Sequence, residues 1–272
     1  MLFFENCEIN LENTFHCGQT FRWKPLGDGS FAGNVEGRSV RAETAEGGLL
    51  LHGAEEKDAP FWRAYFDLDS DYAALLAPVM DAHLRSALDA CQGLRLLNQP
   101  FFETLCSFIL SANNNMRRIA GIVDRFCGIM PVDRNGLHAF PRPADVLAAG
   151  RTWVDGIGAG YRAPYLYEAA ERVAAGFDGA CLRTLPYAEA CKQIRTFRGV
   201  GEKVADCVLL FSCGQRDAFP VDTWMEKVLT QWYGFSGSRT NLKRCAMAHF
   251  GAGAGIAQQV LFAYVVRQKM QA

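Results

Sequence analysis

One stretch of the chain decides its fold: Phe197-Arg198-Gly199-Val200-Gly201-Glu202-Lys203-Val204-Ala205-Asp206-Cys207. Two glycines one residue apart separate two helix-forming segments. Glycine lacks a Cβ and takes positive φ readily, so the backbone at Gly199-Val200-Gly201 is able to come close to a phosphate. Free N–H groups at the start of the second helix then face that anion. The stretch predicts two helices joined by a tight, phosphate-facing hairpin at about residues 187–212.

A lysine and an aspartate accompany this hairpin. Lys203 opens the second helix, and Asp222 follows 19 residues later in the sequence Pro220-Val221-Asp222. The positive end of a helix disfavours a second positive charge, which favours the neutral, nucleophilic amine. A nearby carboxylate stabilises positive charge that develops in a reaction. A surface lysine and a helix-capping aspartate are the plain structural alternatives, and capping is compatible with catalysis.

The composition is typical of a globular protein. The chain has 272 residues, half of them hydrophobic, which is enough for two or three packed lobes. The apolar runs are too short to cross a bilayer, and the N-terminus lacks the basic start of a signal peptide, so we expect no membrane association. Ten cysteines stand without a C-x-x-C pair, which indicates reduced cytosolic thiols and not a disulfide frame or a zinc site.

The net charge of −1 hides a segregation of charge along the chain. Residues 1–90 carry a net −8, residues 91–190 a net +1 and residues 191–272 a net +6. Because phosphates attract basic surfaces, contact with a phosphate-bearing partner such as a nucleic acid would fall on the C-terminal part. Chance asymmetry between lobes is the alternative.

Two kinds of pattern divide the chain. Up to about residue 86, glycines and alternating residues, as in 31–37 and 47–52, predict a twisted antiparallel sheet. After residue 100 the apolar spacing becomes helical. We expect helices at 101–110, 115–127, 161–176, 202–213, 223–234, 239–250 and 255–269. The fold class is therefore α+β, with a sheet domain at 1–86 and a helical region at 87–272.

Three further segments carry side chains that suit nucleic-acid recognition. Asn113-Asn114-Asn115 and Arg118 are of the kind that reads base edges, although three asparagines also favour a cap and turn. Gly158-Ala159-Gly160-Tyr161-Arg162-Ala163 offers either a wedge beside an extruded nucleotide or a packed Tyr with a surface Arg. Phe15-His16-Cys17-Gly18-Gln19-Thr20-Phe21-Arg22-Trp23 by itself predicts a tight turn leading into a strand.

Four strings in this order give the chain a specific resemblance. They are Gly-Gln-Thr-Phe-Arg-Trp from Gly18, Asn-Asn-Asn-x-x-Arg from Asn113, Gly-Tyr-Arg-Ala from Gly160 and Lys-Val-Ala-Asp-Cys from Lys203. Over nearly its whole length the chain resembles the 8-oxoguanine DNA glycosylase/AP lyases of the helix-hairpin-helix (HhH-GPD) superfamily. The resemblance implies a sheet domain followed by two helical lobes, with the active-site cleft between the lobes. Double-stranded DNA containing 8-oxoguanine is the implied partner, and we expect a monomer.

No resident cofactor is expected. Relatives that hold an iron–sulfur cluster have a tight cysteine quartet near the C-terminus, whereas the last stretch here offers only Cys245. We therefore predict no iron–sulfur cluster and no zinc. The resemblance also implies a monovalent cation at the backbone carbonyls of the hairpin, which leaves no signature in the sequence.

The resemblance assigns the chemistry to two residues. Lys203 would attack C1′ of the damaged nucleoside, expel the base and form a Schiff base, and β-elimination would then cut the strand on its 3′ side. Asp222 would support the oxocarbenium-like charge on the sugar and help to position or activate the lysine.

The resemblance also assigns a pocket for the damaged base. The Gly18 carbonyl would accept a hydrogen bond from N7–H of 8-oxoguanine, an atom that guanine lacks. Cys207 would contact one face of the base, Phe262 would stack on the other, and Gln258 would bond the Watson–Crick edge. Phe211 would form part of the wall. For Phe262 the alternative is a core position, because residues 260–264 are apolar.

A second set of residues would act on the opposite strand. Asn113, Arg118 and Arg162 match the family positions that read the estranged cytosine, and Tyr161 matches the wedge. Hydrogen-bond donors aimed at cytosine O2 and N3 would favour excision opposite cytosine over excision opposite adenine.

Four positions depart from the animal and fungal pattern. Trp224 replaces a histidine, Val265 an acidic residue, Arg198 the proline before the hairpin, and Phe211 a methionine. The absence of long tails adds to these departures, and together they suggest a compact prokaryotic enzyme of the cytoplasm, associated with the nucleoid. Arg198 is expected to add a phosphate contact.

Two rival functions stay open from the sequence. A superfamily glycosylase for another lesion, such as an alkylated purine, generally lacks the lysine and relies on the aspartate with water. A noncatalytic DNA-binding hairpin would need the glycines and basic residues but has no use for Lys203 and Asp222.

Overall fold

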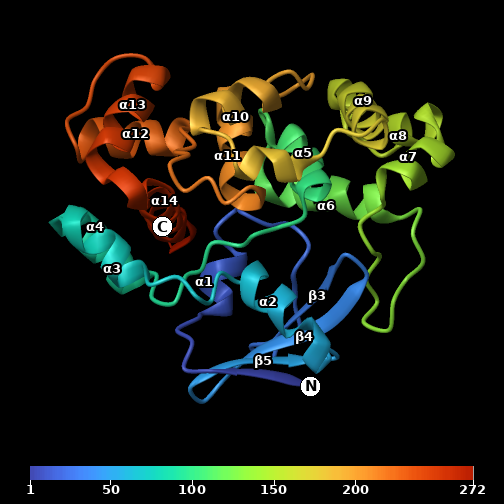
Figure 1. Cartoon of the computed structure of the whole chain (residues 1–272), viewed down its shortest axis with the longest axis horizontal. Helices are drawn as coiled ribbons and strands as arrows, with labels where there is room; N and C mark the ends of the chain where they lie inside the picture. The colour runs from blue at the N-terminus through green and yellow to red at the C-terminus, as the bar shows by residue number, and fades with distance from the viewer. Residues whose placement is uncertain (272) are drawn as a thin grey trace.

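Five strands form one antiparallel sheet near the N-terminus, as the alternating pattern predicts. The computed structural model describes residues 1–271, and the sheet has the order β1-β5-β4-β3-β2. The strands are β1 (Leu2–Glu5), β2 (Lys24–Pro25), β3 (Phe31–Val35), β4 (Arg38–Ala45) and β5 (Gly48–His52). Glu36 and Gly37 join β3 to β4 with φ of 51° and 80°, and two left-handed residues are what a tight hairpin requires. Figure 1 shows the sheet at one end of the molecule, together with the N-terminus.

Short helices complete the sheet domain. α1 (Leu11–Phe15) and α2 (Ala59–Tyr65) contribute to its buried core with the sheet. Aromatic rings fill this core: Phe15 stacks on Trp23 with ring centroids 4.3 Å apart, and Trp62 is fully buried. These helices were not predicted, because five to seven residues are too few to show a clear helical period.

A helix of the structure spans the predicted domain boundary at residue 86. This helix is α4 (Ala82–Ala90), which follows α3 (Tyr72–Leu76). Leu76, Leu84 and Ala87 of these two helices belong to the buried core of the helical region and not to that of the sheet domain. By packing, α3 and α4 therefore belong to the helical region, whereas Leu97, which follows them, belongs to the core of the sheet domain.

Ten further helices build the rest of the chain. They are α5 (Phe101–Ser111), α6 (Met116–Cys127), α7 (Pro143–Ala149), α8 (Arg151–Gly156), α9 (Ala163–Ala174), α10 (Tyr187–Ile194), α11 (Glu202–Ser212), α12 (Thr223–Gln231), α13 (Arg239–Phe250) and α14 (Ala254–Gln271). Each of the seven predicted helices is present, with ends within a few residues. α7 and α8 were missed. Within residues 1–271, no helix has both the length and the apolar character that a bilayer span needs.

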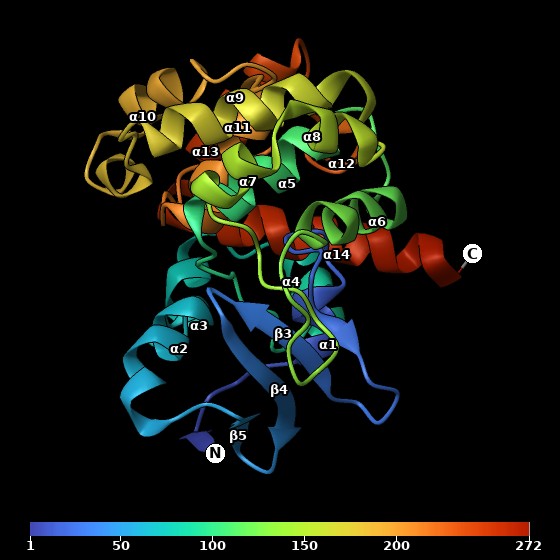
Figure 2. The same ribbon diagram turned by 90° about the vertical axis from the view of Figure 1, so that its right-hand side faces the viewer.

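The helices form two groups above the sheet. Figure 1 shows α3, α4, α12, α13 and α14 on one side and α5 to α11 on the other. α5 is buried along almost its whole length and packs against α9 and α11, whereas α14 packs against α4 and α12. In Figure 2 α14 runs between the sheet domain and the helices α5 to α13. A continuous apolar core joins both groups of helices, so side chains at the boundary between the groups are held in fixed positions.

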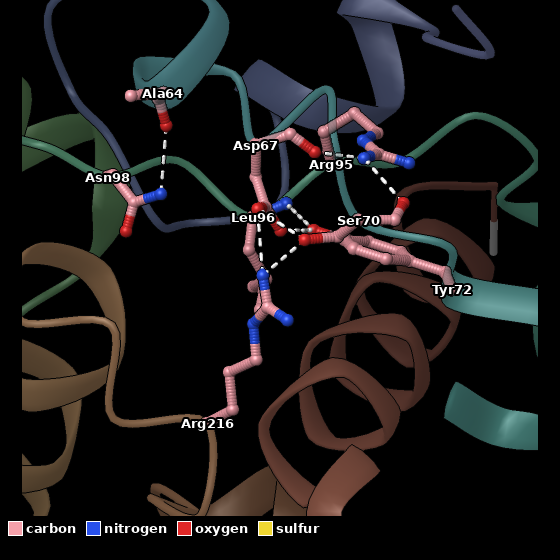
Figure 3. A network of polar contacts seen from close by, with 8 residues as sticks. All are labelled: Ala64, Asp67, Ser70, Tyr72, Arg95, Leu96, Asn98 and Arg216. Carbon is pink, nitrogen blue, oxygen red and sulfur yellow. Dashed lines mark hydrogen bonds and ion pairs between the residues drawn. The ribbon is translucent and has the colours of Figure 1, made fainter. Parts of the chain in front are cut away.

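A polar network ties the sheet domain to the helices behind α11 (Figure 3). Asp67, just after α2, takes the left-handed conformation with φ 51°. Its carboxylate accepts hydrogen bonds from Arg216 and from the Tyr72 hydroxyl, each at 2.8 Å. Arg95 donates to the backbone carbonyl of Ser70 at 2.9 Å and to that of Asp67. The end of α2 is therefore fixed to the loop that follows α11.

Candidate active site

The hairpin between α10 and α11 contains two glycines that do different work. Gly199 has φ 84°, and a Cβ there would lie 2.5 Å from the Tyr165 ring. Gly201 has φ −84° and ψ −174°, so of the two only Gly199 uses the left-handed region. A Cβ on Gly201 would point into open space, and no side chain caps the start of α11. Gly201 thus leaves the N–H groups of α11 uncovered on the outside of the protein.

This difference predicts that a change of glycine to alanine has different effects at the two positions. Gly199→Ala is expected to lower the free energy of unfolding by about 1–2 kcal/mol or more, because alanine is strained at this φ and clashes with Tyr165. Gly201→Ala is expected to leave thermal unfolding nearly unchanged and to weaken duplex binding. Thermal melts and fluorescence titrations with a DNA duplex measure both. Unchanged affinity in Gly201→Ala would contradict a close backbone approach to phosphate.

Lys203 lies in the first turn of α11 and points at the end of α5. Its Nζ lies 3.3 Å from Ser111 Oγ and 5.1 Å from the centroid of the Phe108 ring. The amine is therefore held against α5 and borders a small cavity at the meeting of the two helix groups.

Asp222 is the N-cap of α12, as its structural alternative predicts. Its Oδ1 accepts hydrogen bonds from the backbone N–H groups of Trp224 and Met225, both at 2.9 Å. Its Oδ2 accepts no hydrogen bond within residues 1–271. Asp222 borders the same cavity as Lys203, so capping fixes a carboxylate beside the amine and leaves one oxygen free.

The cavity brings together all the residues predicted for the base pocket. It is lined by Cys17, Gly18, Phe108, Lys203, Cys207, Phe211, Pro220, Asp222, Gln258, Gln259 and Phe262. Its volume is about 30 Å³, which is room for one water molecule. A purine base therefore has to displace side chains to enter.

Gln258 presents an unpaired acceptor to this cavity. Its side chain is 3% exposed, and its Nε2 donates to the Pro220 carbonyl at 3.2 Å. Its Oε1 is buried without a hydrogen-bond partner among the described residues. A buried acceptor left unsatisfied costs about 1–3 kcal/mol, so such a group in a cavity points to a ligand that donates to it.

Gly18 lies at the cavity wall in a conformation that favours glycine. Its φ is 76°, and a Cβ would lie 3.2 Å from the Phe262 ring and 3.3 Å from the Met116 sulfur. The turn before it is fixed by Gln259, whose Nε2 donates to the Cys17 carbonyl at 2.8 Å. The backbone of Gly18 is therefore exposed to the cavity between Phe262 and Met116.

The rest of the Gly-Gln-Thr-Phe-Arg-Trp string has a structural role. The Gln19 amide bonds the backbone carbonyls of Thr14 and Arg95, each at 2.8 Å. Arg22 forms a buried ion pair with Glu103 of α5 at 2.9 Å. The string thus anchors the sheet domain to α5 and holds Gly18 in place.

Cys207 forms the side of the cavity one turn along α11 from Lys203. Burial raises the pKa of its thiol to about 11, so it is protonated at neutral pH. Phe211, the next turn, stacks on Phe108 with ring centroids 5.4 Å apart. These side chains give the cavity a neutral, largely apolar wall.

The asparagine triplet joins α5 to α6, and two of its members have the cap and turn role. Asn115 Oδ1 caps α6 by accepting the backbone N–H of Arg118 at 2.9 Å, and Asn114 Nδ2 donates to the Leu110 carbonyl at 3.0 Å. Asn113 is exposed and left-handed with φ 49°, and its amide makes no hydrogen bond within residues 1–271. Asn113 and the exposed Arg118 side chain are thus available to a ligand.

Tyr161 and Arg162 lie in a short 3-10 helix next to this loop, but they differ in exposure. Tyr161 is 58% exposed, as a wedge requires. Arg162 is only 5% exposed, and its guanidinium donates to the carbonyls of Ala112 at 3.0 Å and Asn113 at 3.1 Å. In this structure Arg162 therefore supports the Asn113 turn, and its contact with the estranged cytosine stays a prediction. A local motif does not reveal these carbonyls, which lie about 50 residues earlier.

A buried charge cluster behind the hairpin was missed. Asp206, with no exposed surface, accepts hydrogen bonds from Lys243 at 3.1 Å and from the Tyr187 hydroxyl. Lys243 also pairs with Glu202 at 2.7 Å. Burial raises the pKa of Asp206 to about 6. The sequence does contain a signal for this cluster, because Asp206 is a charged residue on the inner face of the helix predicted at 202–213.

Arg198 and Trp224 are two of the four positions that depart from the animal and fungal pattern, and each has a cation–aromatic contact. The Arg198 guanidinium lies 4.9 Å from the Tyr165 ring centroid, so its phosphate contact stays a prediction. Trp224 has the ammonium groups of Lys227 and Lys269 at 5.2 and 4.3 Å from its ring. A basic, aromatic surface thus stands beside Asp222.

Metal ligands do not gather anywhere in the described part of the chain: residues 1–271 contain no group of three or more His, Cys, Asp or Glu that could hold an ion. The expectations of no zinc and no cluster, and of a cation at the hairpin carbonyls, stay predictions.

Comparisons with known proteins agree with this arrangement. The family model of the 8-oxoguanine DNA glycosylase N-terminal domain matches residues 1–105, and that of the HhH-GPD superfamily base excision DNA repair proteins matches residues 106–249. The N-glycosylase/DNA lyase OGG1 of Arabidopsis thaliana is 30% identical, over 94% of this chain and 77% of its own length. The N-glycosylase/DNA lyase of Saccharomyces cerevisiae is 27% identical, over 87% of this chain and 71% of its own length.

Solved structures extend the likeness to the whole chain. MBOgg1 in complex with a low-affinity DNA ligand has a TM-score of 0.91 at 30% identity, over 99% of this chain and 100% of that one. The 8-oxoguanine glycosylase/lyase of Clostridium acetobutylicum, with DNA containing cytosine opposite 8-oxoguanine, has 0.91 at 29% identity, over 99% of each chain. The 3-methyladenine DNA-glycosylase of Archaeoglobus fulgidus, at 21% identity and a TM-score of 0.76, shares the fold. The chain therefore belongs to the HhH-GPD superfamily of base excision DNA repair proteins and, within it, to the 8-oxoguanine N-glycosylase/DNA lyases.

Proposed function

We propose that the protein, as a monomer, excises 8-oxoguanine from double-stranded DNA, preferentially opposite cytosine, and cuts the strand through a Schiff base on Lys203. The observation that carries this proposal is the convergence of Lys203, Asp222 and the unpaired Gln258 acceptor on one cavity. A noncatalytic hairpin module has no use for that convergence. A monofunctional glycosylase has no use for the amine.

The reaction follows from the two charged groups. The lone pair of the Lys203 amine attacks C1′, and the N-glycosidic bond breaks with its electron pair leaving on the base, which takes up a proton. The free oxygen of Asp222 stabilises the positive charge on the sugar as this bond lengthens. The adduct passes its extra N–H proton to O4′, the C1′–O4′ bond breaks, and the nitrogen lone pair forms the C=N bond of an iminium. Loss of a C2′ proton then expels the 3′ phosphate and cuts the strand.

Selectivity for the lesion is supported by two acceptors. 8-Oxoguanine carries a hydrogen on N7, which the Gly18 carbonyl would accept, whereas guanine presents a lone pair there. Gln258 Oε1, which is buried without a partner among the described residues, would accept a hydrogen bond from an N–H of the Watson–Crick edge. One made bond against one lost bond is worth about 1–3 kcal/mol.

Preference for cytosine is supported by the loop between α5 and α6. Asn113 has an unpaired, exposed amide, Arg118 is exposed, and Tyr161 projects beside them. These groups would read the estranged base while Tyr161 fills the gap in the stack. Arg162 would join them by releasing one of its backbone carbonyls.

Borohydride trapping tests the proposal. The protein is mixed with duplexes that carry one 8-oxoguanine opposite C, A, G or T, and any Schiff base is reduced to a stable adduct. We expect an adduct on the 8-oxoguanine duplexes, most abundant opposite cytosine, and none on the matched guanine duplex. Binding without an adduct on any duplex would refute a lyase, and equal yields opposite all four bases would refute the cytosine preference.

A further inference from the structure

Ser111, the last residue of α5, contacts the Lys203 amine and has no part in the reaction described above. Its Oγ donates a hydrogen bond to the Phe108 carbonyl at 2.8 Å. A hydroxyl has one hydrogen to donate, so its remaining lone pairs face other groups. Lys203 Nζ lies 3.3 Å away and therefore donates to Ser111. The direction of this hydrogen bond is fixed by the geometry of α5.

A hydrogen bond of this kind orients a nucleophile. A neutral primary amine has two N–H bonds and one lone pair, and rotation about Cε–Nζ carries the lone pair through all directions. An acceptor that takes one N–H removes the orientations in which the lone pair faces Ser111. The remaining orientations of the amine favour a lone pair that faces the cavity, which Asp222 and Cys207 also border. The amine is then ready for attack on C1′.

The position of Ser111 depends on the residues that we propose to contact the opposite DNA strand. The two residues that follow it, Ala112 and Asn113, give their carbonyls to the buried Arg162 guanidinium. Asn113 needs this support, because a left-handed asparagine costs energy that its surroundings must supply. The Arg162 side chain also lies 4.2 Å from the Tyr161 ring. One short segment thus joins the wedge to the nucleophile.

We propose that Ser111 is a positioning residue for Lys203, and that Arg162 holds Ser111 in position through the carbonyls of Ala112 and Asn113. This inference rests on the proposed function, since it concerns the same reaction. Engagement of the opposite strand is thereby coupled mechanically to the direction of the amine.

Three variants of α5 test the role of the hydroxyl. Ser111→Ala removes the acceptor, Ser111→Thr keeps it, and Ser107→Ala makes the same deletion one turn earlier in the same helix. The single-turnover rate of strand cutting at saturating enzyme is expected to fall about fivefold to tenfold in Ser111→Ala, as for one lost hydrogen bond. The duplex Kd and the Tm should stay unchanged. Ser111→Thr and Ser107→Ala should match the parent.

A double-mutant cycle tests the link to Arg162. The duplex carries 8-oxoguanine opposite an abasic residue, so Arg162 has no base to read. Arg162→Ala should slow cutting in the parent and add no further loss in Ser111→Ala, and Arg162→Lys gives a milder version if Arg162→Ala unfolds. If the losses in cutting rate are additive, the link between Arg162 and Ser111 is overturned. If Ser111→Ala cuts at the rate of the parent, or if Ser111→Thr cuts as slowly as Ser111→Ala, the positioning role of Ser111 is overturned. Failure of the proposed function is distinct, because the parent protein would then form no adduct.

Discussion

Replacement of Lys203 by glutamine is expected to abolish the borohydride adduct and to slow base release by at least about 10³-fold. Glutamine keeps N–H donors near Ser111, but its amide nitrogen is not a nucleophile and forms no Schiff base. Because only the reactive amine is lost, the Tm and the affinity for an 8-oxoguanine duplex should change little. Single-turnover gel assays, trapping and duplex titration measure the three quantities.

A matched control separates this amine from the other lysines. Lys192→Gln makes the same change on the exposed side of α10, in the first helix of the hairpin, and should trap and cut like the parent. An adduct that persists in Lys203→Gln would show that another amine is the nucleophile. Lys203 would then be a phosphate contact only.

Lys243→Met is expected to lower the free energy of unfolding by about 3–5 kcal/mol at pH 8. Lys243 is the cation of the buried cluster behind the hairpin, within 3.1 Å of Asp206 and 2.7 Å of Glu202. Methionine fills a similar volume but leaves the fully buried Asp206 carboxylate without a partner charge. Urea denaturation followed by circular dichroism gives the free energy of unfolding.

This loss should shrink as the pH falls. Burial already raises the pKa of Asp206 from 3.8 to about 6 with Lys243 present, and removal of the cation raises it further. A carboxyl with a raised pKa in the folded state contributes stability at low pH that is lost as the pH rises through that pKa. In the parent this window runs from about 4 to 6, and in the variant it extends higher. The deficit at pH 8 should therefore exceed that at pH 5.

A second substitution provides the control for this prediction. Asp206→Asn in the Lys243→Met background removes the stranded charge and should recover most of the lost stability, whereas the exposed Lys227→Met should cost less than about 0.5 kcal/mol. An equal deficit at both pH values, or no recovery in the double variant, would contradict a buried ion pair.

The sequence allowed prediction of those parts of the molecule that local patterns determine. The glycine turn, α11 and the capping position of Asp222 depend on residues within one or two turns of the chain, and each is present. The resemblance then selected Gly18 and Gln258, which the structure brings to one cavity although they are 240 residues apart. No periodicity would have joined them.

Other features depend on contacts that local patterns do not encode. The burial of Arg162 arises from carbonyls about 50 residues earlier, and the Ser111–Lys203 contact spans 92 residues. α3 and the first half of α4 lie in the predicted sheet domain by sequence, but both helices pack with α14 at the opposite end of the chain. Their assignment requires knowledge of which apolar faces meet.

The burial of the pocket cysteines has a consequence under oxidative stress, the condition that produces 8-oxoguanine. Peroxide attacks the thiolate and not the thiol. Burial raises the pKa of Cys207 to about 11 and that of Cys17 to about 12, so both thiols of the base pocket are almost entirely protonated at neutral pH. Within residues 1–271 only Cys181 is exposed, and it lies outside the cavity. The oxidant that creates the lesion would thus spare the pocket that we propose to recognise it.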